Sequence, residues 1–313
     1  MLAYVVKRVL ATIPTIGIVA VFVFLMLRLT PGDPAAVIAG DYATAEDIAR
    51  IREKLGLTEP ILVQFTTWAG QLLQGDLGTS IFNNLPVSTL IAQRVGPTLA
   101  LAATTLTFSV LVAVPLGTLA AWRAGSLLDR AIMVFAVAGF SVPVFVLGYA
   151  LVYLIALQGG VLPVQGYRPL SSGFWPWLQH LILPTLTLSV IYIALIARIT
   201  RAAVMEVMGE DYVRTARAKG QSRVKVLLRH ALANAAVPIV TVVGLGVALL
   251  IGGVVVTETV FNIPGLGRLV LDAVLARDYP IIQGLILFFA LIYVLVNLVI
   301  DLSYTLFDPR IRY

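Results

Sequence analysis

The sequence of 313 residues contains no cysteine, which excludes disulfides, thiolate nucleophiles and cysteine-ligated metal sites. Its two histidines, His180 and His230, are too few to favour a histidine-built metal site. Charged residues make up only 12% of the chain, about half of their share in soluble domains, whereas hydrophobic residues make up 59%. These proportions predict an integral membrane protein.

Motifs that would support catalysis are also missing. The sequence lacks the phosphate-binding string G-x-x-x-x-G-K-[ST], the zinc motif H-E-x-x-H and the nucleophile elbow G-x-S-x-G. We therefore expect no enzymatic activity in this chain and no cofactor or metal bound by it. The net charge of +6 is typical of cationic loops on one side of a membrane, so nucleic acid is not an expected partner.

Six uncharged runs are long enough for a helical span, which needs about 20 residues. The resulting fold class is an all-α integral membrane protein with six transmembrane helices. The runs are Val9–Leu27, Val95–Trp122, Ala131–Tyr167, Pro169–Ala197, Ala231–Thr257 and Tyr279–Ile300.

The basic residues predict the orientation of these spans. With both termini in the cytoplasm, fourteen Lys and Arg residues face the cytoplasm and eight lie outside or at the outer ends of spans. The first run is too long for the apolar core of a signal peptide, and no A-x-A cleavage site follows it before Thr30. It is interpreted as a retained anchor.

Residues 30–96 differ from the spans, because Asp33–Arg94 holds seven acidic and four basic residues. Thr44 is placed to cap a helix, Asp47 occupies the capping-box position, and Gly56 is placed to end that helix. We expect a small helical external segment between the first and second spans.

Few ionisable residues interrupt the spans, which argues against a proton-coupled carrier. Glu258 and Asp301 lie near span ends, where solvation or ion pairing is the favoured interpretation. Hydroxyl groups are more numerous, and they either bond to their own helices or line a substrate path. They belong to Thr104, Thr105, Thr107, Ser109, Ser141, Thr185, Thr187 and Ser189.

A basic stretch, Glu210–Pro238, separates two of the apolar runs. The enrichment of Lys and Arg in cytoplasmic loops could by itself explain the charge of this stretch, but it does not explain the order of its residues. Asp211 is placed to cap a helix over Tyr212–Lys219, Gly220 suits a left-handed stop, and Ser222 is placed to cap a second helix.

The first of these helices offers a small contact face. Tyr212, Ala216 and Lys219 share one side of it, and Ala216 and Ala218 are small enough for close approach by another protein. A short capped helix with such a face is expected to insert into a partner.

These residues carry a family resemblance. Thr215-Ala216-Arg217-Ala218-Lys219-Gly220, followed by His230-Ala231-Leu232 and Asn234, resembles the EAA loop of membrane subunits of ABC importers, in the form found in dipeptide, oligopeptide and nickel permeases. The resemblance covers nearly the whole chain through further motifs in the same order. They are LTPGDP, LGLTEP, GDLGTS, ETVFNIPGLGRL, RDYPIIQG and FDPRIRY.

The resemblance implies the type I importer permease fold and a division of the chain into 1–29, 30–96, 97–306 and 307–313. These parts are the cytoplasmic N-terminus with the first span, the periplasmic helical segment, the transmembrane core with the coupling loop 201–234, and a cytoplasmic tail. Residues expected to couple to an ATPase are Glu210, Asp211, Tyr212, Thr215, Ala216, Arg217, Ala218, Lys219 and Gly220. The glutamate that names the EAA motif falls at Arg214, so no role is transferred to it.

The resemblance also implies partners. They are a homologous second permease, two cytoplasmic ATPase subunits that bind ATP and Mg, and a periplasmic or lipid-anchored binding protein, in the lipid of a bacterial inner membrane. Together they would import a peptide-like solute, such as a dipeptide, an oligopeptide or glutathione, by alternating access. Import of nickel or a metal chelate by the same architecture remains an alternative, as does a stand-alone secondary carrier.

The apolar stretch Glu258–Gly267 is a candidate outer gate. Pro264, beside Gly265 and Gly267, can support a re-entrant turn, although a simple exposed loop is an equal alternative. The residues assigned to the gate are Glu258, Phe261, Asn262, Pro264 and Gly265.

Overall fold

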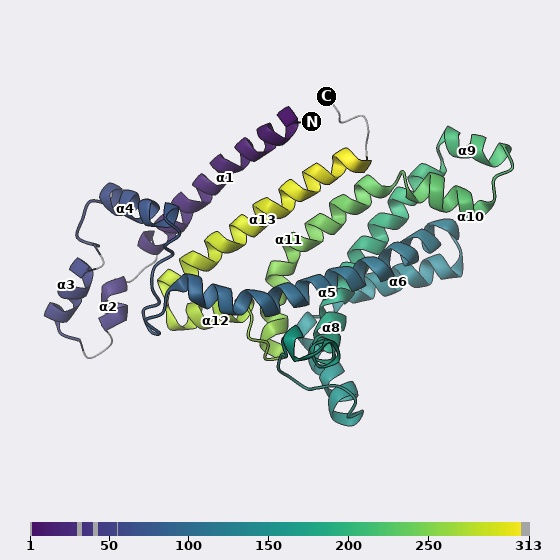
Figure 1. Cartoon of the computed structure of the whole chain (residues 1–313). Helices are drawn as coiled ribbons and strands as arrows, with labels where there is room; N and C mark the ends of the chain where they lie inside the picture. The colour runs from purple at the N-terminus through teal and green to yellow at the C-terminus, as the bar shows by residue number, and fades with distance from the viewer. Residues whose placement is uncertain (1, 30–32, 40–42, 55, 308–313) are drawn as a thin grey trace. The chain divides into compact units, whose positions relative to one another are not determined.

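A computed structural model of the chain describes residues 2–29, 33–39, 43–54 and 56–307 (Figure 1). Within these ranges every regular element is a helix, apart from one isolated bridge between Thr79 and Pro86, so the predicted all-α fold is confirmed. The elements are α1 (Leu2–Leu29), α2 (Pro34–Ala39), α3 (Ala45–Lys54), α4 (Ile61–Leu73), α5 (Val87–Trp122), α6 (Leu127–Ser141), α7 (Val144–Leu151), η1 (Val152–Gln158), η2 (Leu170–Ser172), α8 (Phe174–Met208), α9 (Asp211–Ala218), α10 (Arg223–Lys225), η3 (Val226–Leu232), α11 (Ala236–Val260), α12 (Leu266–Ala276) and α13 (Tyr279–Phe307). Most of the predicted tail, 308–313, lies outside the described residues.

Four helices are long and apolar enough to cross a membrane: α5, α8, α11 and the part of α13 from Tyr279 to Leu302. A fifth crossing is formed if the bent pair Leu127–Ser141 and Val144–Gln158 counts as one span. In α1 the described apolar stretch, Leu10–Met26, is shorter than these helices. The described residues therefore support four to five of the six predicted spans.

The third predicted run, Ala131–Tyr167, is not one straight helix. Its two helical parts are bent by 100° on either side of Val142 and Pro143. Val142 is extended, with φ −93° and ψ 121°, as is usual for a residue that precedes proline. Pro143 then occupies the cap position of α7, where its missing N–H does not interrupt a helical hydrogen bond.

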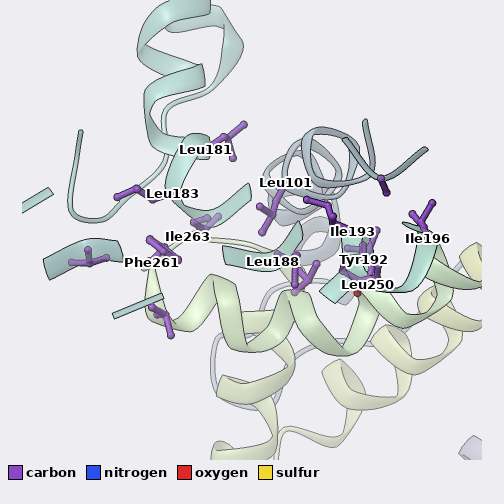
Figure 2. Packing of buried hydrophobic residues seen from close by; sticks show 14 of the residues in the cluster. Leu101, Leu181, Leu183, Leu188, Tyr192, Ile193, Ile196, Leu250, Phe261 and Ile263 are labelled. Atoms are coloured by element: carbon purple, nitrogen blue, oxygen red, sulfur yellow. The ribbon is translucent and has the colours of Figure 1, made fainter. Parts of the chain in front are cut away.

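The chain forms two compact units, which are described separately. The first comprises residues 96–268 with both chain ends, 1–5 and 295–313; the second comprises 6–95 and 269–294. The core of the first unit gathers side chains of α8, such as Leu188, Tyr192 and Ile196, with Leu101 of α5 and Leu250 of α11 (Figure 2). Burial of this apolar surface by protein rather than lipid makes α8 the central helix of the unit.

Two glycines of the first unit allow other helices to approach α8 closely. A Cβ on Gly117 of α5 would lie 2.5 Å from the carbonyl oxygen of Ala197. A Cβ on Gly139 of α6 would lie 2.9 Å from Cγ1 of Val190. Small residues serve this purpose at helix crossings in membranes, where close van der Waals contact replaces the hydrophobic effect.

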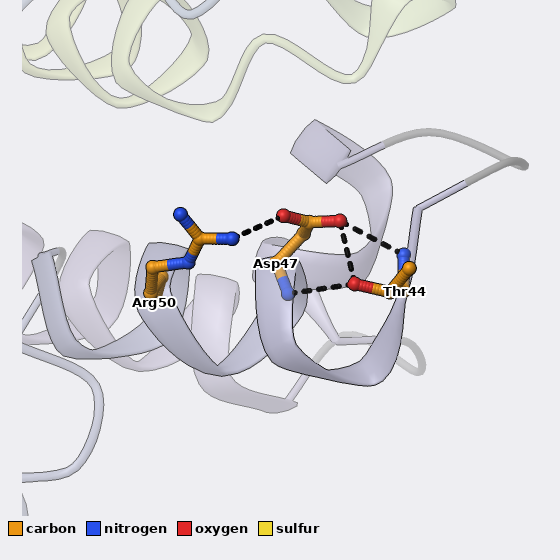
Figure 3. A network of polar contacts seen from close by, with 3 residues as sticks. All are labelled: Thr44, Asp47 and Arg50. Atoms are coloured by element: carbon orange, nitrogen blue, oxygen red, sulfur yellow. Dashed lines mark hydrogen bonds and ion pairs between the residues drawn. The ribbon is translucent and has the colours of Figure 1, made fainter.

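The second unit contains the predicted external helices α2, α3 and α4. The Thr44 hydroxyl accepts the backbone N–H of Asp47 at 3.2 Å, and the Asp47 carboxylate accepts the Thr44 hydroxyl at 2.6 Å and the Thr44 backbone N–H at 3.1 Å (Figure 3). These bonds, with the charge of Arg50, hold the pKa of the Asp47 carboxyl below its ordinary value. The predicted capping box is confirmed, and Gly56, which was predicted to end this helix, follows it with a left-handed φ of +64°.

Side chains from distant parts of the second unit meet in its interior. The buried Ser80 hydroxyl donates to the carboxylate of Asp278 at 2.6 Å. Phe24 of α1 contacts Phe65 and Trp68 of α4, with ring centroids 5.1 and 5.6 Å apart. The aromatic contacts hold α4 to α1, and the Ser80–Asp278 bond holds the segment before α5 to the segment between α12 and α13.

Candidate functional site

Helix α9 lies between the end of α8 and the short helix α10, so the predicted loop does contain a helix. Glu210 occupies the N-cap position of this helix and is extended, with φ −70° and ψ 149°. Asp211 lies inside the helix and pairs with Arg214 at 3.2 Å. The prediction that Asp211 caps this helix is therefore wrong by one residue.

The end of α9 follows the sequence prediction. Gly220 has φ +77°, the left-handed conformation that glycine adopts without steric cost, and its N–H donates to the carbonyl of Arg217 at 2.9 Å. Ser222 then caps α10, because its hydroxyl accepts the N–H of Lys225 at 3.4 Å. Both predictions are confirmed.

One side of α9 packs inside the chain. Val213 and Ala216 are buried, with exposed fractions of 0% and 5%, and form a cluster with Val226. Val207 and Met208 from the end of α8 pack on this cluster. The expectation that Ala216 offers a small surface to another protein is therefore wrong, because this alanine fixes α9 to its own chain.

The other side of α9 is exposed. Ala218 and Tyr212 lie on this side with the predicted basic residues. Partial burial and the charge of Glu210 raise the pKa of the Tyr212 phenol above its ordinary value. We call this exposed side the α9 outer face. Its members are Asp211, Tyr212, Arg214, Thr215, Arg217, Ala218 and Lys219.

A hydrogen bond that the site prediction omitted closes the loop. Nε2 of His230 lies 2.8 Å from Oε1 of Gln221, and the side-chain amide of Asn234 donates to the carbonyl of His230 at 2.6 Å. His230 and Asn234 were visible in the sequence as parts of the EAA-like motif. The contact with Gln221 is made by His230, nine residues later in the chain, and Asn234 bonds to the backbone of His230.

The turn after α11 is built around a buried carboxylate. The sequence favoured a solvated or ion-paired helix end for Glu258, and the solvated alternative is wrong, because this residue has an exposed fraction of 0%. Its Oε1 accepts the Thr98 hydroxyl at 2.6 Å, and its Oε2 accepts the N–H of Arg268 at 2.9 Å. The Thr98 oxygen in turn accepts the N–H of Leu266 at 2.8 Å. This network joins α5, α11 and the start of α12.

The glycines of this turn make room for that carboxylate. A Cβ on Gly265 would lie 2.0 Å from Oε1 of Glu258, and one on Gly267 would lie 2.6 Å from Cα of Val255. Asn262 has a positive φ of 52°, and its side-chain oxygen accepts a hydrogen bond from Arg268. The turn is thus a compact hydrogen-bonded structure, in which Pro264 and Asn262 are exposed.

Further contacts join the turn to other parts of the first unit. The carbonyl of Phe261 accepts the N–H of Gly166 at 2.8 Å, and Phe261 itself belongs to the core cluster (Figure 2). A Cβ on Gly148 of α7 would lie 3.1 Å from Val260 and 3.4 Å from Phe261. The predicted gate residues therefore do lie together, but the partner Thr98 was not among them.

A groove of about 490 Å³ lies between α5 and α8. Three of the hydroxyl residues noted in the sequence, Thr104, Thr107 and Thr185, line it, and the Thr104 and Thr185 oxygens lie 2.8 Å apart. Aromatic and aliphatic side chains, such as Phe108 and Trp177, form most of the remaining wall. The groove is large enough for a small organic group.

Comparisons with known proteins agree with this architecture. Residues 113–313 match the family described as binding-protein-dependent transport system inner membrane component, and residues 1–102 match the N-terminal family of the same membrane components. A probable peptide ABC transporter permease of Sinorhizobium fredii, y4tP, is 56% identical over 310 residues, which is 99% of each chain. The glutathione transport system permease GsiC of Escherichia coli K12 is 46% identical over 314 residues, which is 100% of each.

A solved structure shows the same fold. The inward-facing MetNI methionine ABC transporter has a chain that matches with a TM-score of 0.59 at 17% identity, over 71% of this chain and 97% of that chain. This likeness confirms the predicted importer permease fold. Since the family profiles together match nearly the whole sequence, the chain belongs to the inner membrane components of binding-protein-dependent transport systems, the permeases of ABC importers.

Proposed function

We propose that this permease passes a peptide-like solute from an external binding protein to the cytoplasm, driven by ATPase subunits that dock on the α9 outer face. The observation that carries the proposal is the construction of α9. One side is buried at Val213 and Ala216, and the other is exposed with the charges of Arg214, Arg217 and Lys219. Such a helix is fixed to its own chain and presents a free surface to a partner.

The class of solute is proposed from the relatives. One is named a probable peptide permease and the others glutathione permeases, and all of them match over almost the full length. Glutathione is itself a small peptide-like molecule. These names do not favour the alternative of nickel import, and membership in a binding-protein-dependent family does not favour a stand-alone carrier.

The assembly follows from the same reasoning. One chain supplies one α9 outer face, so we propose a second, homologous permease that supplies another, with two ATPase subunits binding ATP and Mg below them. The binding protein delivers the solute on the opposite side, where the turn after α11 serves as the outer gate. In this arrangement both termini lie in the cytoplasm.

Substitution of the exposed Ala218 tests the docking surface. The assembled complex in proteoliposomes is expected to lose solute uptake and the stimulation of ATP hydrolysis by loaded binding protein when it carries Ala218→Trp, because an indole at a close contact surface overpacks it. The matched control is Ala124→Trp, which places the same side chain on an exposed alanine outside α9. Uptake and pull-down of the ATPase subunits are measured together. Wild-type uptake and wild-type ATPase pull-down in Ala218→Trp would show that the ATPase subunits do not dock on the α9 outer face.

A further inference from the structure

An ion pair joins the first turn of α6 to α8. Nε of Arg201 lies 2.5 Å from Oδ1 of Asp129, and a terminal nitrogen of the same guanidinium donates to Oδ2 at 2.8 Å. Oδ2 also accepts the N–H of Gly125 at 2.9 Å. The Asp129 side chain is 4% exposed and that of Arg201 is 27% exposed.

The geometry of this pair is restrictive. Two parallel N–H···O bonds fix both the distance and the direction of the guanidinium, which a lysine ammonium cannot do. Because the Asp129 carboxylate is buried, loss of its donors would leave an uncompensated buried charge, which is costly. The pair therefore fixes one point of α8 relative to one point of α6.

A second fixed point lies further along the same two helices. Gly139 of α6 crosses α8 at Val190, where a Cβ on the glycine would lie 2.9 Å from the valine side chain. Ten residues separate Asp129 from Gly139, and eleven separate Arg201 from Val190, which correspond to about 15 and 16 Å of helix. The two helices therefore run antiparallel and are held at matched positions.

Beyond the ion pair α8 continues to α9 without a flexible linker. Seven residues separate Arg201 from Met208, about 10 Å of helix. Gly209 and Glu210 then follow, and their N–H groups donate to the carbonyls of Glu206 and Val207 at 3.0 and 3.1 Å. A hydrogen-bonded turn therefore joins α9 directly to the end of α8 that carries Arg201.

The other end of α6 leads towards the turn after α11. After the bend at Val142 and Pro143 the chain enters α7, in which Gly148 packs against Val260 and Phe261. Packed and hydrogen-bonded elements of this kind can carry coupling between distant sites. The series α9, α8, α6, α7 and the turn is continuous within the first unit.

We propose that Asp129 and Arg201 are positioning residues that transmit the movement of α9 to α6 and α7, and through them to the proposed outer gate. This inference rests on the proposed function, in which ATPase subunits dock on the α9 outer face. Loss of the paired hydrogen bonds uncouples the gate from the ATPase subunits. The ATPases still dock and hydrolyse ATP, but the gate no longer opens and closes in step with hydrolysis.

The test uses the complete complex in proteoliposomes, with Arg201→Lys as the principal variant. Lysine keeps the charge that compensates Asp129, so the subunit folds, but it loses the paired bonds. We expect a normal pull-down of the ATPase subunits, basal ATP hydrolysis within twofold of wild type, and uptake per ATP hydrolysed reduced about tenfold. The matched control is Arg198→Lys, three residues away on the same helix. Arg198 is exposed and contacts α6 by a cation–π contact with Phe140, which a lysine can also make, so all three values are expected to stay unchanged.

A second readout follows the gate itself. Since the native chain has no cysteine, Pro264→Cys introduces a single exposed thiol into the turn. Its rate of labelling by a membrane-impermeant maleimide is expected to differ between resting and vanadate-trapped complexes, and this difference is expected to vanish in Pro264→Cys/Arg201→Lys. Asp129→Asn, which removes the carboxylate instead of the guanidinium, is expected to give the same result.

Two results would overturn the inference. In the first, Arg201→Lys and Asp129→Asn retain wild-type uptake per ATP and wild-type labelling differences. In the second, both variants lose ATPase docking and basal hydrolysis together, which would make the pair a purely structural contact. Failure of the proposed function is recognised separately, because the wild-type permease itself would then not bind the ATPase subunits.

Discussion

The backbone of Gly265 touches the buried carboxylate of Glu258, and a Cβ would lie 2.0 Å from its Oε1. Gly265→Ala is therefore expected to lower the stability of the subunit by about 1–3 kcal/mol, the usual cost of overpacking a closed site. The measurement is the thermal-unfolding midpoint of the purified subunit in detergent.

Glu258, whose carboxylate clashes with the added methyl group, can itself be replaced. In a Glu258→Ala background the added methyl of Gly265→Ala no longer meets the carboxylate, so its additional cost is expected to fall below about 0.5 kcal/mol, as a double-mutant cycle would show. Equal costs in both backgrounds would mean that the carboxylate does not set the glycine requirement. Gly252→Ala in α11, where a Cβ would meet open space among the described residues, serves as the control.

For single residues, the sequence predicted the backbone conformation of turns and caps better than the burial of side chains. Gly220 and Ser222 were correctly assigned because a left-handed turn and a helix cap depend on a few neighbouring residues. The environment of Ala216 was predicted wrongly, because its burial depends on Val226 and the end of α8. The burial of Glu258 was missed for the same reason, since Thr98 lies 160 residues away in the sequence.

Among the elements, α3 offers a direct test of local stability. Its capping box is exposed and depends on the hydroxyl of Thr44, so Thr44→Ala is expected to increase hydrogen exchange of the first α3 amides about fivefold, because loss of such a cap costs about 1 kcal/mol. Thr44→Ser is the matched control and keeps the hydroxyl. Mass spectrometry of peptides that cover Ala45–Lys54 measures the exchange.

The same cap has a defined pH dependence. Because the pKa of Asp47 is lowered in the folded state, its contribution is complete above the ordinary value of 3.8 and is lost as the pH falls through the lower, folded value. The protection that separates wild type from Asp47→Asn, after correction for the intrinsic exchange rate, is therefore expected to be constant above about pH 5 and to shrink below pH 4. A difference that grew as the pH fell would contradict the capping bonds.

Element boundaries show where sequence reasoning reached its limit. One span was predicted within the long apolar run Ala131–Tyr167, but the bend of 100° at Val142 and Pro143 was not. The π-helical segments η1 and η3 were not predicted, because widening of a helix depends on how its neighbours pack. The runs that became α8 and α11 were predicted correctly, since hydrophobic length alone decides them.

For the whole molecule the proposed orientation can be tested with single cysteines. Asn83→Cys lies in the segment proposed to be external and Arg223→Cys in the loop proposed to couple to the ATPase, and both positions are exposed. In intact cells with a permeabilised outer membrane, an impermeant maleimide is expected to label Asn83→Cys and to leave Arg223→Cys unlabelled, because cationic loops remain in the cytoplasm.

Two controls complete this experiment. The wild-type chain has no cysteine and gives the labelling background. Disruption of the inner membrane must make Arg223→Cys reactive, which shows that the thiol itself is accessible. Labelling of Arg223→Cys alone in intact cells would reverse the proposed orientation of every span.

The close crossings of α5 and α6 with α8 have a consequence for engineering this permease. Replacing helical glycine by alanine usually stabilises a protein by reducing the entropy of the unfolded chain. Gly70 in α4 suits that strategy, since a Cβ there would meet open space among the described residues. Gly117 and Gly139 do not, because α8 already occupies the volume of a methyl group. Variants for structural work are therefore best sought at positions such as Gly70, while the glycines packed against α8 are kept.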